Sequence, residues 1–262
     1  MCGIVGYFNR EPNKNIIKKM SVPLKQRGPD EYGEFSSDDG CLFLAHRRLA
    51  IQDITDGGSQ PMKSHCGRFV IIFNGEIYNF NELKIELELD TSIFWRGHSD
   101  TEVLIECIAQ WGLNTTLSKL NGMFSFALFD RVKNNLTLAR DRFGEKPLYI
   151  YSSLNSFAFS SELKPIELFT NSLTINESAV QAQLQYSYIP APYSIYNEVF
   201  KLLPGHFVEI DLVSYTKVSL DNIKPYWEVR EAVQKGLAMR RNFKCLGDAI
   251  EETEKVLLKG SS

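Results

Sequence analysis

The sequence predicts a layered α+β fold, in which β-strands pack together and helices cover them. Of the 262 residues, 44% are hydrophobic and 12% are aromatic, which is enough to build a packed core. Short apolar runs bounded by Gly, Pro, Asn and Asp are typical of strands. They alternate with stretches whose apolar residues share one helical face, and strands on each side of helical stretches favour a layered arrangement.

The elements of the first half follow this pattern in chain order. Residues 2–8 (CGIVGYF) are expected to form a short buried strand. Residues 15–26 are expected to form a short helix, which the loop Arg27-Gly28-Pro29-Asp30 ends. The further expected elements are strands at 40–45, 69–73, 124–130 and 136–140, and helices at 80–89 and 100–111.

The second half continues with shorter elements. Residues 149–151 and 157–159 are expected to form a hairpin, and residues 178–186 a short helix. A further strand pair is expected around the loops Pro190-Ala191-Pro192 and Leu203-Pro204-Gly205. No internal repeat or low-complexity segment is present.

Three regions are expected along the chain. Residues 2–211 form the main domain, residues 212–241 a charged connector, and residues 242–262 the incomplete start of a second domain. The last region contains an amphipathic helix, residues 246–258, whose apolar face needs a partner. A chain that ends on such a face indicates truncation, and the alternative is that the helix docks back onto the first domain.

Charge and cysteine content exclude several classes of protein. A net charge of −3 gives no electrostatic reason to expect nucleic acid or a membrane surface as partner. The five cysteines lack CxxC spacing and the four histidines are scattered, so neither a disulfide framework nor a metal site is indicated. No apolar run approaches the ~18 residues of a membrane span, and the start does not resemble a signal peptide, so we expect a cytoplasmic protein.

Cys2 is the first candidate for a catalytic residue. If Met1 is removed, Cys2 carries a thiol and a free α-amine, and an α-amine has a pKa near ~8 in model peptides. A thiol beside its own base is a nucleophile and base pair within one residue. The alternative is a buried cysteine that opens an apolar strand.

Arg48 lies in the stretch Ala45-His46-Arg47-Arg48-Leu49-Ala50-Ile51, which alternates as a strand does. An arginine among apolar neighbours needs an anion, and a substrate carboxylate suits its forked guanidinium. A structural ion pair is the alternative, and the residues alone do not decide between the two.

Asn74-Gly75-Glu76 follows the apolar run at 69–73, where polar groups at a strand end tend to line a pocket. The Asn74 amide and the Gly75 N–H are two donors that could stabilise an oxyanion. Taken alone, Asn-Gly is a dipeptide typical of a hairpin turn.

Asp100 follows His98-Ser99 and is the fourth candidate. Ser99 or Asp100 could simply be the N-cap of the expected helix. Asp100 could equally bind the ammonium of an amino-acid ligand. A nucleophile, an arginine, an oxyanion hole and an acid together suit attack on the side-chain amide of an α-amino acid, with glutamine the obvious candidate.

The chain resembles a known family in successive blocks: MCGIVGYF, RGPDEYG, AHRRLAIQD, GSQPM, FNGEIYN, HSDTEVL, LNGMFSFALFD, ARDRFGEKPLYI and FSSELKPI. These look like blocks of class II glutamine amidotransferases of the glutamine-hydrolysing asparagine synthetase type. The resemblance is clear for residues 1 to about 210 and weak for the residues after them. It implies an N-terminal-nucleophile hydrolase fold, a four-layer αββα sandwich.

The resemblance also implies a role for each site residue. The Cys2 thiolate attacks the glutamine amide, and Asn74 and the Gly75 N–H stabilise the oxyanion. Arg48 binds the carboxylate of the glutamine substrate, and Ile51 also contacts the substrate. Asp100 with Glu76 binds the substrate ammonium. No cofactor is expected in this chain.

The resemblance implies a second domain for the whole protein, a synthetase domain that binds ATP and Mg²⁺ and activates aspartate. The SGGxDS phosphate loop of that domain does not occur in the sequence, so this chain is expected to hydrolyse glutamine at most. Two alternatives stay open. The chain could belong to another amide-forming ligase, of a surface-polysaccharide or antibiotic pathway, or be a non-catalytic glutamine-binding remnant. A homodimer is possible.

Several charged residues in these blocks are given no chemical role. Arg27 and Asp30 are expected to shape the loop near the N-terminus. Four charged residues of the ARDRFGEKP block are expected to form a salt-bridged hairpin or a domain contact: Arg140, Asp141, Arg142 and Lys146.

Overall fold

The computed structural model describes residues 1–51, 53–239, 243 and 245–261. Residues 241 and 242, where the sequence analysis places the end of the connector, lie outside these. Residues Met1–Tyr226 form one compact unit and Trp227–Ser262 a second. The second unit contains the helices α7 (Val229–Ala238) and α8 (Leu246–Ser261). The expected domain boundaries themselves stay a prediction.

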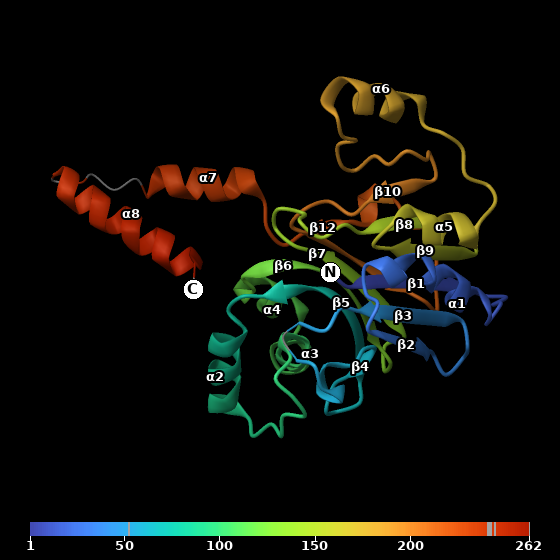
Figure 1. Ribbon diagram of the computed structural model, residues 1–262, viewed down its shortest axis with the longest axis horizontal. Helices are drawn as coiled ribbons and strands as arrows, with labels where there is room; N and C mark the ends of the chain where they lie inside the picture. The colour runs from blue at the N-terminus through green and yellow to red at the C-terminus, as the bar shows by residue number, and fades with distance from the viewer. Residues whose placement is uncertain (52, 240–242, 244, 262) are drawn as a thin grey trace. The chain divides into compact units, whose positions relative to one another are not determined.

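Two six-stranded antiparallel sheets form the centre of the first unit (Figure 1). The first sheet has the strand order β10 (Val199–Lys201), β8 (Tyr149–Ser152), β9 (Ser156–Ser160), β1 (Gly3–Asn9), β3 (Leu42–Arg48) and β2 (Glu31–Ser36). The second sheet has the order β12 (Lys224–Pro225), β11 (His206–Asp211), β7 (Asn135–Arg140), β6 (Gly122–Asp130), β5 (Phe69–Ile77) and β4 (Met62–Lys63).

Helices cover the outer face of each sheet (Figure 1). The first sheet packs against α1 (Ile16–Ser21) and α5 (Leu163–Phe169). The second sheet packs against α2 (Phe80–Asp90), α3 (Asp100–Trp111) and α4 (Leu113–Lys119). The remaining elements of this unit are α6 (Glu177–Tyr186) and the 3₁₀ turns Pro23–Gln26, Asp56–Gly58 and Leu220–Asn222. The order of layers is therefore helix, sheet, sheet, helix, as expected.

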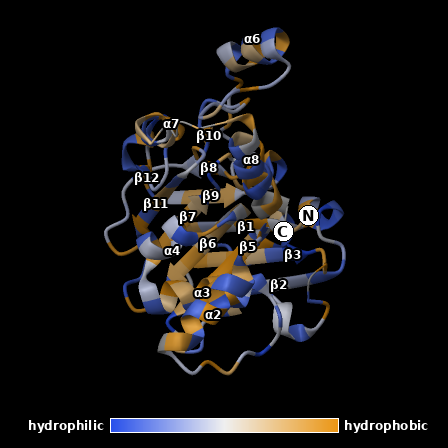
Figure 2. Cartoon of the chain, turned by 90° about the vertical axis from the view of Figure 1, so that its left-hand side faces the viewer, coloured by the Kyte–Doolittle hydropathy of each residue, from blue (hydrophilic) through white to orange (hydrophobic). Residues whose placement is uncertain are grey.

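Side-chain alternation along the strands explains the three cores. On β1, Ile4 points into the core between the sheets, whereas the next residue, Val5, packs with Ile17 of α1. On β5, Ile72 points between the sheets and Ile71 toward the helices. Because both faces of each sheet are buried, the central strands need apolar residues at almost every position. Figure 2 shows hydrophobic colour over much of β5 and β6.

The structure confirms most of the expected elements and corrects some. Asn74-Gly75 is not a turn, because β5 continues through it and pairs Asn74 with Ser125 and Gly75 with Phe124 of β6. The strands β10 and β11 do not form a pair, since they belong to different sheets. The sequence analysis missed β2, β4, β12, α4, α5 and α7.

Within the described residues, no helix combines the length and the apolar character that crossing a membrane requires.

Candidate active site

Cys2 lies directly before β1, which is flanked by β3 and β9 in the first sheet. Its Sγ accepts the N–H of Leu49 (3.5 Å) and lies 3.8 Å from the Leu49 carbonyl oxygen, to which the thiol donates. Burial raises the pKa of the Cys2 thiol above its usual range. The thiol is therefore protonated at neutral pH and needs a base before it can attack.

The chain terminus lies beside this thiol. The Arg27 Nε donates to the Cys2 carbonyl oxygen (3.0 Å), which confirms that Arg27 shapes the N-terminal region. Burial is the main cause that lowers the pKa of the α-amine of Met1. Arg27 and Lys146 lower this pKa as well, whereas Cys2 and Asp30 raise it. While Met1 is present, the net effect therefore favours the uncharged form of its amine.

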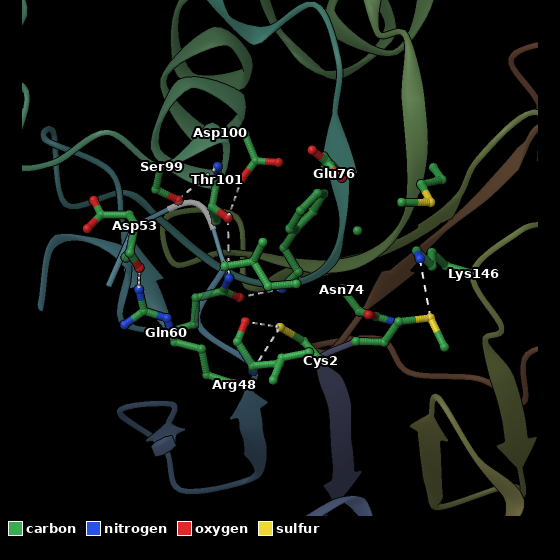
Figure 3. Close-up of a pocket in the computed structure, with 17 residues that line it drawn as sticks. Cys2, Arg48, Asp53, Gln60, Asn74, Glu76, Ser99, Asp100, Thr101 and Lys146 are labelled. Atoms are coloured by element: carbon green, nitrogen blue, oxygen red, sulfur yellow. Dashed lines mark hydrogen bonds between the residues drawn. The ribbon is translucent and has the colours of Figure 1, made fainter. Parts of the chain in front are cut away.

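All seven residues expected in the site line one cavity of about 120 Å³. They come from β3, β5, α3 and the segments next to β1 and β3, and Figure 3 labels five of them around one space: Cys2, Arg48, Asn74, Glu76 and Asp100. Its size suits a ligand no larger than an amino acid, since pockets for drug-sized ligands start at roughly 300 Å³. These residues are Cys2, Arg48, Ile51, Asn74, Gly75, Glu76 and Asp100.

The Asn74 side chain is the most unusual group of this cavity. It is only 1% exposed, and among the described residues neither its Nδ2 nor its Oδ1 has a hydrogen-bond partner. Each buried polar atom without a partner costs about 1–3 kcal/mol. Its place beside Cys2 in the cavity indicates that a ligand group completes these bonds (Figure 3).

The N–H of Gly75 also faces the cavity. Along an antiparallel strand, N–H groups point alternately to the two sides. The Phe73 N–H points away from β6, where it donates to Gln60 Oε1 (2.6 Å). The Ile77 N–H does the same and donates to Asp100 Oδ2 (2.9 Å). Midway between them, the Gly75 N–H points in the same direction, into the cavity that Gly75 lines.

Gly75 is a glycine because β6 comes too close for a side chain. A Cβ at this position would overlap the Met123 carbonyl oxygen and would lie 2.7 Å from the Phe124 Cα. The Asn-Gly pair is therefore explained by the close approach of two strands and not by a turn conformation.

Asp100 is the first residue of α3, and Ser99 is its N-cap, whose side chain accepts the Thr101 N–H (3.1 Å). Burial raises the pKa of the Asp100 carboxyl to about 6, and the Glu76 carboxylate raises it too. Two carboxyl groups facing one cavity are stabilised by a cation, and an amino-acid ammonium provides one.

Arg48 makes the structural ion pair that was its alternative interpretation. Its Nη1 donates to Glu31 Oε2 (2.8 Å) and to the Thr55 carbonyl oxygen (3.1 Å), and its Nη2 donates to the Asp53 carbonyl oxygen. It nevertheless lines the cavity. Ile51 also lines it, but at the rim, since its side chain is 73% exposed.

Sequence reasoning missed several polar residues of the cavity. Gln60 joins two walls, because its Oε1 accepts from Phe73 while its Nε2 donates to Thr101 Oγ1 (3.2 Å). Asp53 Oδ2 accepts the His98 N–H (2.8 Å) and so holds the loop before α3. The blocks GSQPM and HSDTEVL contain Gln60 and Thr101, but a motif does not say which of its members faces a ligand.

The segment 140–146 differs from the salt-bridged hairpin that was expected. Arg140 binds carbonyl oxygens of Lys146 (2.8 Å) and Leu202 (2.7 Å). Asp141 accepts backbone N–H groups, including that of Lys146 (3.0 Å). Lys146 lines the cavity, which the sequence analysis did not expect; the absence of a chemical role and the alternative of a domain contact stay predictions.

In the described parts of the chain, no three His, Cys, Asp or Glu side chains are arranged to hold a metal ion.

Comparison with solved structures supports the fold. The glutamine phosphoribosylpyrophosphate amidotransferase from B. subtilis, complexed with ADP and GMP, superimposes with a TM-score of 0.64 at 20% identity. The match covers 86% of this chain and 49% of that chain. It places this chain among the N-terminal-nucleophile hydrolase folds.

Curated relatives are similar over most of this chain. The "Putative asparagine synthetase (glutamine-hydrolyzing) 2" of Methanocaldococcus jannaschii is 35% identical over 90% of this chain and 50% of its own length. The asparagine synthetase (glutamine-hydrolyzing) 1 of Bacillus subtilis is 37% identical over 78% of this chain and 33% of its own. The chain thus spans a third to a half of the length of these relatives.

The family model described as "Glutamine amidotransferase domain" matches residues 1–227, which include the whole sandwich and every residue of the cavity. The chain therefore belongs to the glutamine amidotransferase domain family.

Proposed function

We propose that this chain, once Met1 has been removed, hydrolyses glutamine to glutamate and ammonia with Cys2 as the nucleophile. The observation that carries the proposal is the buried Asn74 amide, which lacks a partner among the described residues and lines the same cavity as the Cys2 thiol. A group that the folded chain leaves unsatisfied is suited to charge that develops only during the reaction.

The first step forms a thioester. The α-amine of Cys2 takes the thiol proton, and the sulfur attacks the side-chain carbonyl carbon of glutamine. The carbonyl oxygen becomes an oxyanion, which the Asn74 Nδ2 and the Gly75 N–H stabilise. As the carbon–nitrogen bond breaks, the protonated amine returns the proton to the leaving nitrogen, which departs as ammonia. Water then attacks the thioester and releases glutamate and the thiol.

The other end of the cavity binds the amino-acid part of the substrate. Asp100 and Glu76 attract the α-ammonium, and Arg48 attracts the α-carboxylate. Arg48 holds Glu31 at the same time, so its ion pair orients the guanidinium instead of removing it from the site. Ile51 covers the rim and contacts the methylene groups of the substrate.

In the longer relatives, this unit is joined to a further segment. From their names, we propose that the ammonia passes to an aspartate activated by ATP and Mg²⁺ in a synthetase domain, and yields asparagine. This step depends on residues outside the present sequence, and its acceptor could belong to another amide-forming ligase.

The test uses the chain with Cys2 as its N-terminus, verified by intact mass. We expect glutamate release from glutamine and one adduct from the glutamine analogue 6-diazo-5-oxo-norleucine, located on Cys2. Cys2→Ala abolishes both, whereas Cys66→Ala, at an exposed cysteine, changes neither. A processed chain that is inert and unlabelled would contradict the proposal and indicate a binding module.

A further inference from the structure

Lys146 presents a buried ammonium to the cavity. The residue is only 5% exposed, yet within the described part of the chain the hydrogen-bond partner of its Nζ is the thioether sulfur of Met1, at 3.3 Å. A thioether is a weak acceptor, and a buried charge needs strong partners. The Lys146 ammonium therefore makes its contact with the residue whose removal creates the proposed active terminus.

The backbone of Lys146 is held on both sides. Its N–H donates to Asp141 Oδ2 (3.0 Å), and its carbonyl oxygen accepts from Arg140 Nε (2.8 Å). The same Asp141 carboxylate accepts the N–H groups of Phe124, Phe143 and Glu145. The lysine is thus fixed in place by a network that also contacts the start of β6, directly across from Gly75.

Lys146 lies at the end of the cavity away from the groups that would bind the amino-acid part of a substrate. Figure 3 shows Arg48 and Asp100 on one side and Lys146 on the other, with Glu76 and Cys2 between them. A cation at this end faces the chain terminus. Only a few covalent bonds separate the Met1 sulfur from the nitrogen of Cys2, so the ammonium lies within roughly 10 Å of that nitrogen.

We propose that Lys146 is a positioning residue of the active site, whose ammonium faces the α-amine of Cys2 once Met1 is gone and keeps that amine uncharged. The inference rests on the proposed function, because an uncharged amine is what accepts the thiol proton. Like charges repel, so a neighbouring ammonium disfavours protonation of the amine.

Other charged groups face the terminus as well. Arg27, beyond the first 3₁₀ turn, also contacts the Met1 sulfur through its Nη2 (3.9 Å) and disfavours a charged Met1 amine, whereas Cys2 and Asp30 favour one. Arg27 is paired with Glu162 at 3.2 Å, which offsets part of its charge. Asp30 Oδ2 is engaged by the Ala50 N–H at 2.8 Å. Lys146 is the buried member of this set and, unlike Arg27, has no carboxylate partner among the described residues, so the role is assigned to it.

The test compares Lys146→Met, which removes the charge and keeps the length, with Lys146→Arg, which keeps the charge. The acid limb of the pH profile of kcat is measured at saturating glutamine. We expect Lys146→Met to move this limb to higher pH by roughly 0.5 to 1, a loss of about three- to tenfold on the acid side with a plateau close to that of the parent chain. Lys146→Arg and Lys133→Met, at an exposed turn lysine, keep the limb unchanged.

A second readout does not depend on turnover. In the Cys2→Ala background, the pH dependence of α-amine acylation by acetic anhydride is followed by peptide mass spectrometry. We expect Lys146→Met to shift this titration in the same direction, and Lys146→Gln serves as a second neutral variant if the first does not fold.

An unchanged amine titration in a folded neutral variant would overturn the inference. A rise in KM with an unchanged limb would overturn it too, because Lys146 would then contact substrate and not act on the amine. If the parent chain released no glutamate while the amine titration still shifted, the proposed function would fail and the role of Lys146 would stand.

Discussion

Asn74→Leu should make the protein more stable and nearly inactive. The Asn74 amide is buried, and in the described part of the chain its Nδ2 and Oδ1 have no hydrogen-bond partners. Leucine has a similar shape and removes both polar atoms. Each unsatisfied buried polar atom costs about 1–3 kcal/mol, and imperfect packing of leucine offsets part of the gain. We therefore expect a net gain of about 1–3 kcal/mol.

A gain of this size raises Tm by roughly 2–12 °C, at about 2–4 °C per kcal/mol for a domain of this size. Calorimetry on the processed chain measures this shift. Loss of one oxyanion donor should lower the glutaminase kcat by about 10²–10³-fold. The two effects have opposite directions, which separates loss of chemistry from loss of folding.

Asn79→Leu is the matched control, because the side-chain amide of Asn79 has hydrogen-bond partners for both its nitrogen and its oxygen. Its Nδ2 donates to the Lys119 carbonyl oxygen (3.0 Å), and its Oδ1 accepts the Asn121 N–H (2.9 Å). We expect this variant to lose about 1–2 kcal/mol of stability. A lower Tm for Asn74→Leu, equal to that of the control, would refute the view that the Asn74 amide is unsatisfied in the free protein.

Three further predictions concern other parts of the site. Burial raises the pKa of Asp100 to about 6, so this carboxyl becomes neutral as the pH falls below 6. The Kd of glutamine for the Cys2→Ala chain, measured by calorimetry, should therefore rise roughly tenfold from pH about 7 to about 5. Asp100→Asn should abolish that pH dependence. Gly75→Ala forces a methyl group against the Met123 carbonyl oxygen, which should cost about 1–3 kcal/mol in urea denaturation and lower kcat. Glu102, fully buried, holds the loop before α3 through its carboxylate, so Glu102→Ala should cost about 2–4 kcal/mol.

Each of these has a contradicting result. A glutamine Kd that does not change with pH in the Cys2→Ala chain would exclude an ammonium contact with Asp100. Wild-type stability for Gly75→Ala would show that β5 and β6 can separate at little cost. Glu82→Ala, on the exposed face of α2, is the control for Glu102→Ala, and an equal loss in both would remove the structural role of Glu102.

The sequence predicted the central strands because burial on both faces leaves continuous apolar runs, as in residues 69–73. It missed β2, whose residues Glu31–Ser36 are only half-buried at a sheet edge and read as polar. It assigned a turn to Asn74-Gly75, because this dipeptide is typical of turns. The rule applies only where a strand ends, and β5 continues through these residues. The close approach of β6 comes from residues nearly fifty positions later, which local pattern does not contain.

The candidate site was predicted for residues whose type already suggests chemistry, such as Cys2 and Asp100. Lys146 was missed because a lysine in a charged run is usually solvated. Its burial depends on Arg140 and Asp141, which bind backbone groups of segments distant in sequence, including Leu202 and Phe124. No pattern within the block reveals those contacts.

The position of β1 has a consequence for the entropy of the reaction. Chain termini usually fray, but here pairing with β3 begins at Gly3, and Ile4 exchanges hydrogen bonds with Ser161 through its N–H (3.1 Å) and carbonyl oxygen (2.9 Å). The nucleophile is thereby immobilised during folding, before any substrate arrives. The freedom that a mobile terminus would lose in each catalytic cycle is lost once, when the sheet forms, so binding energy can be used to orient the glutamine amide.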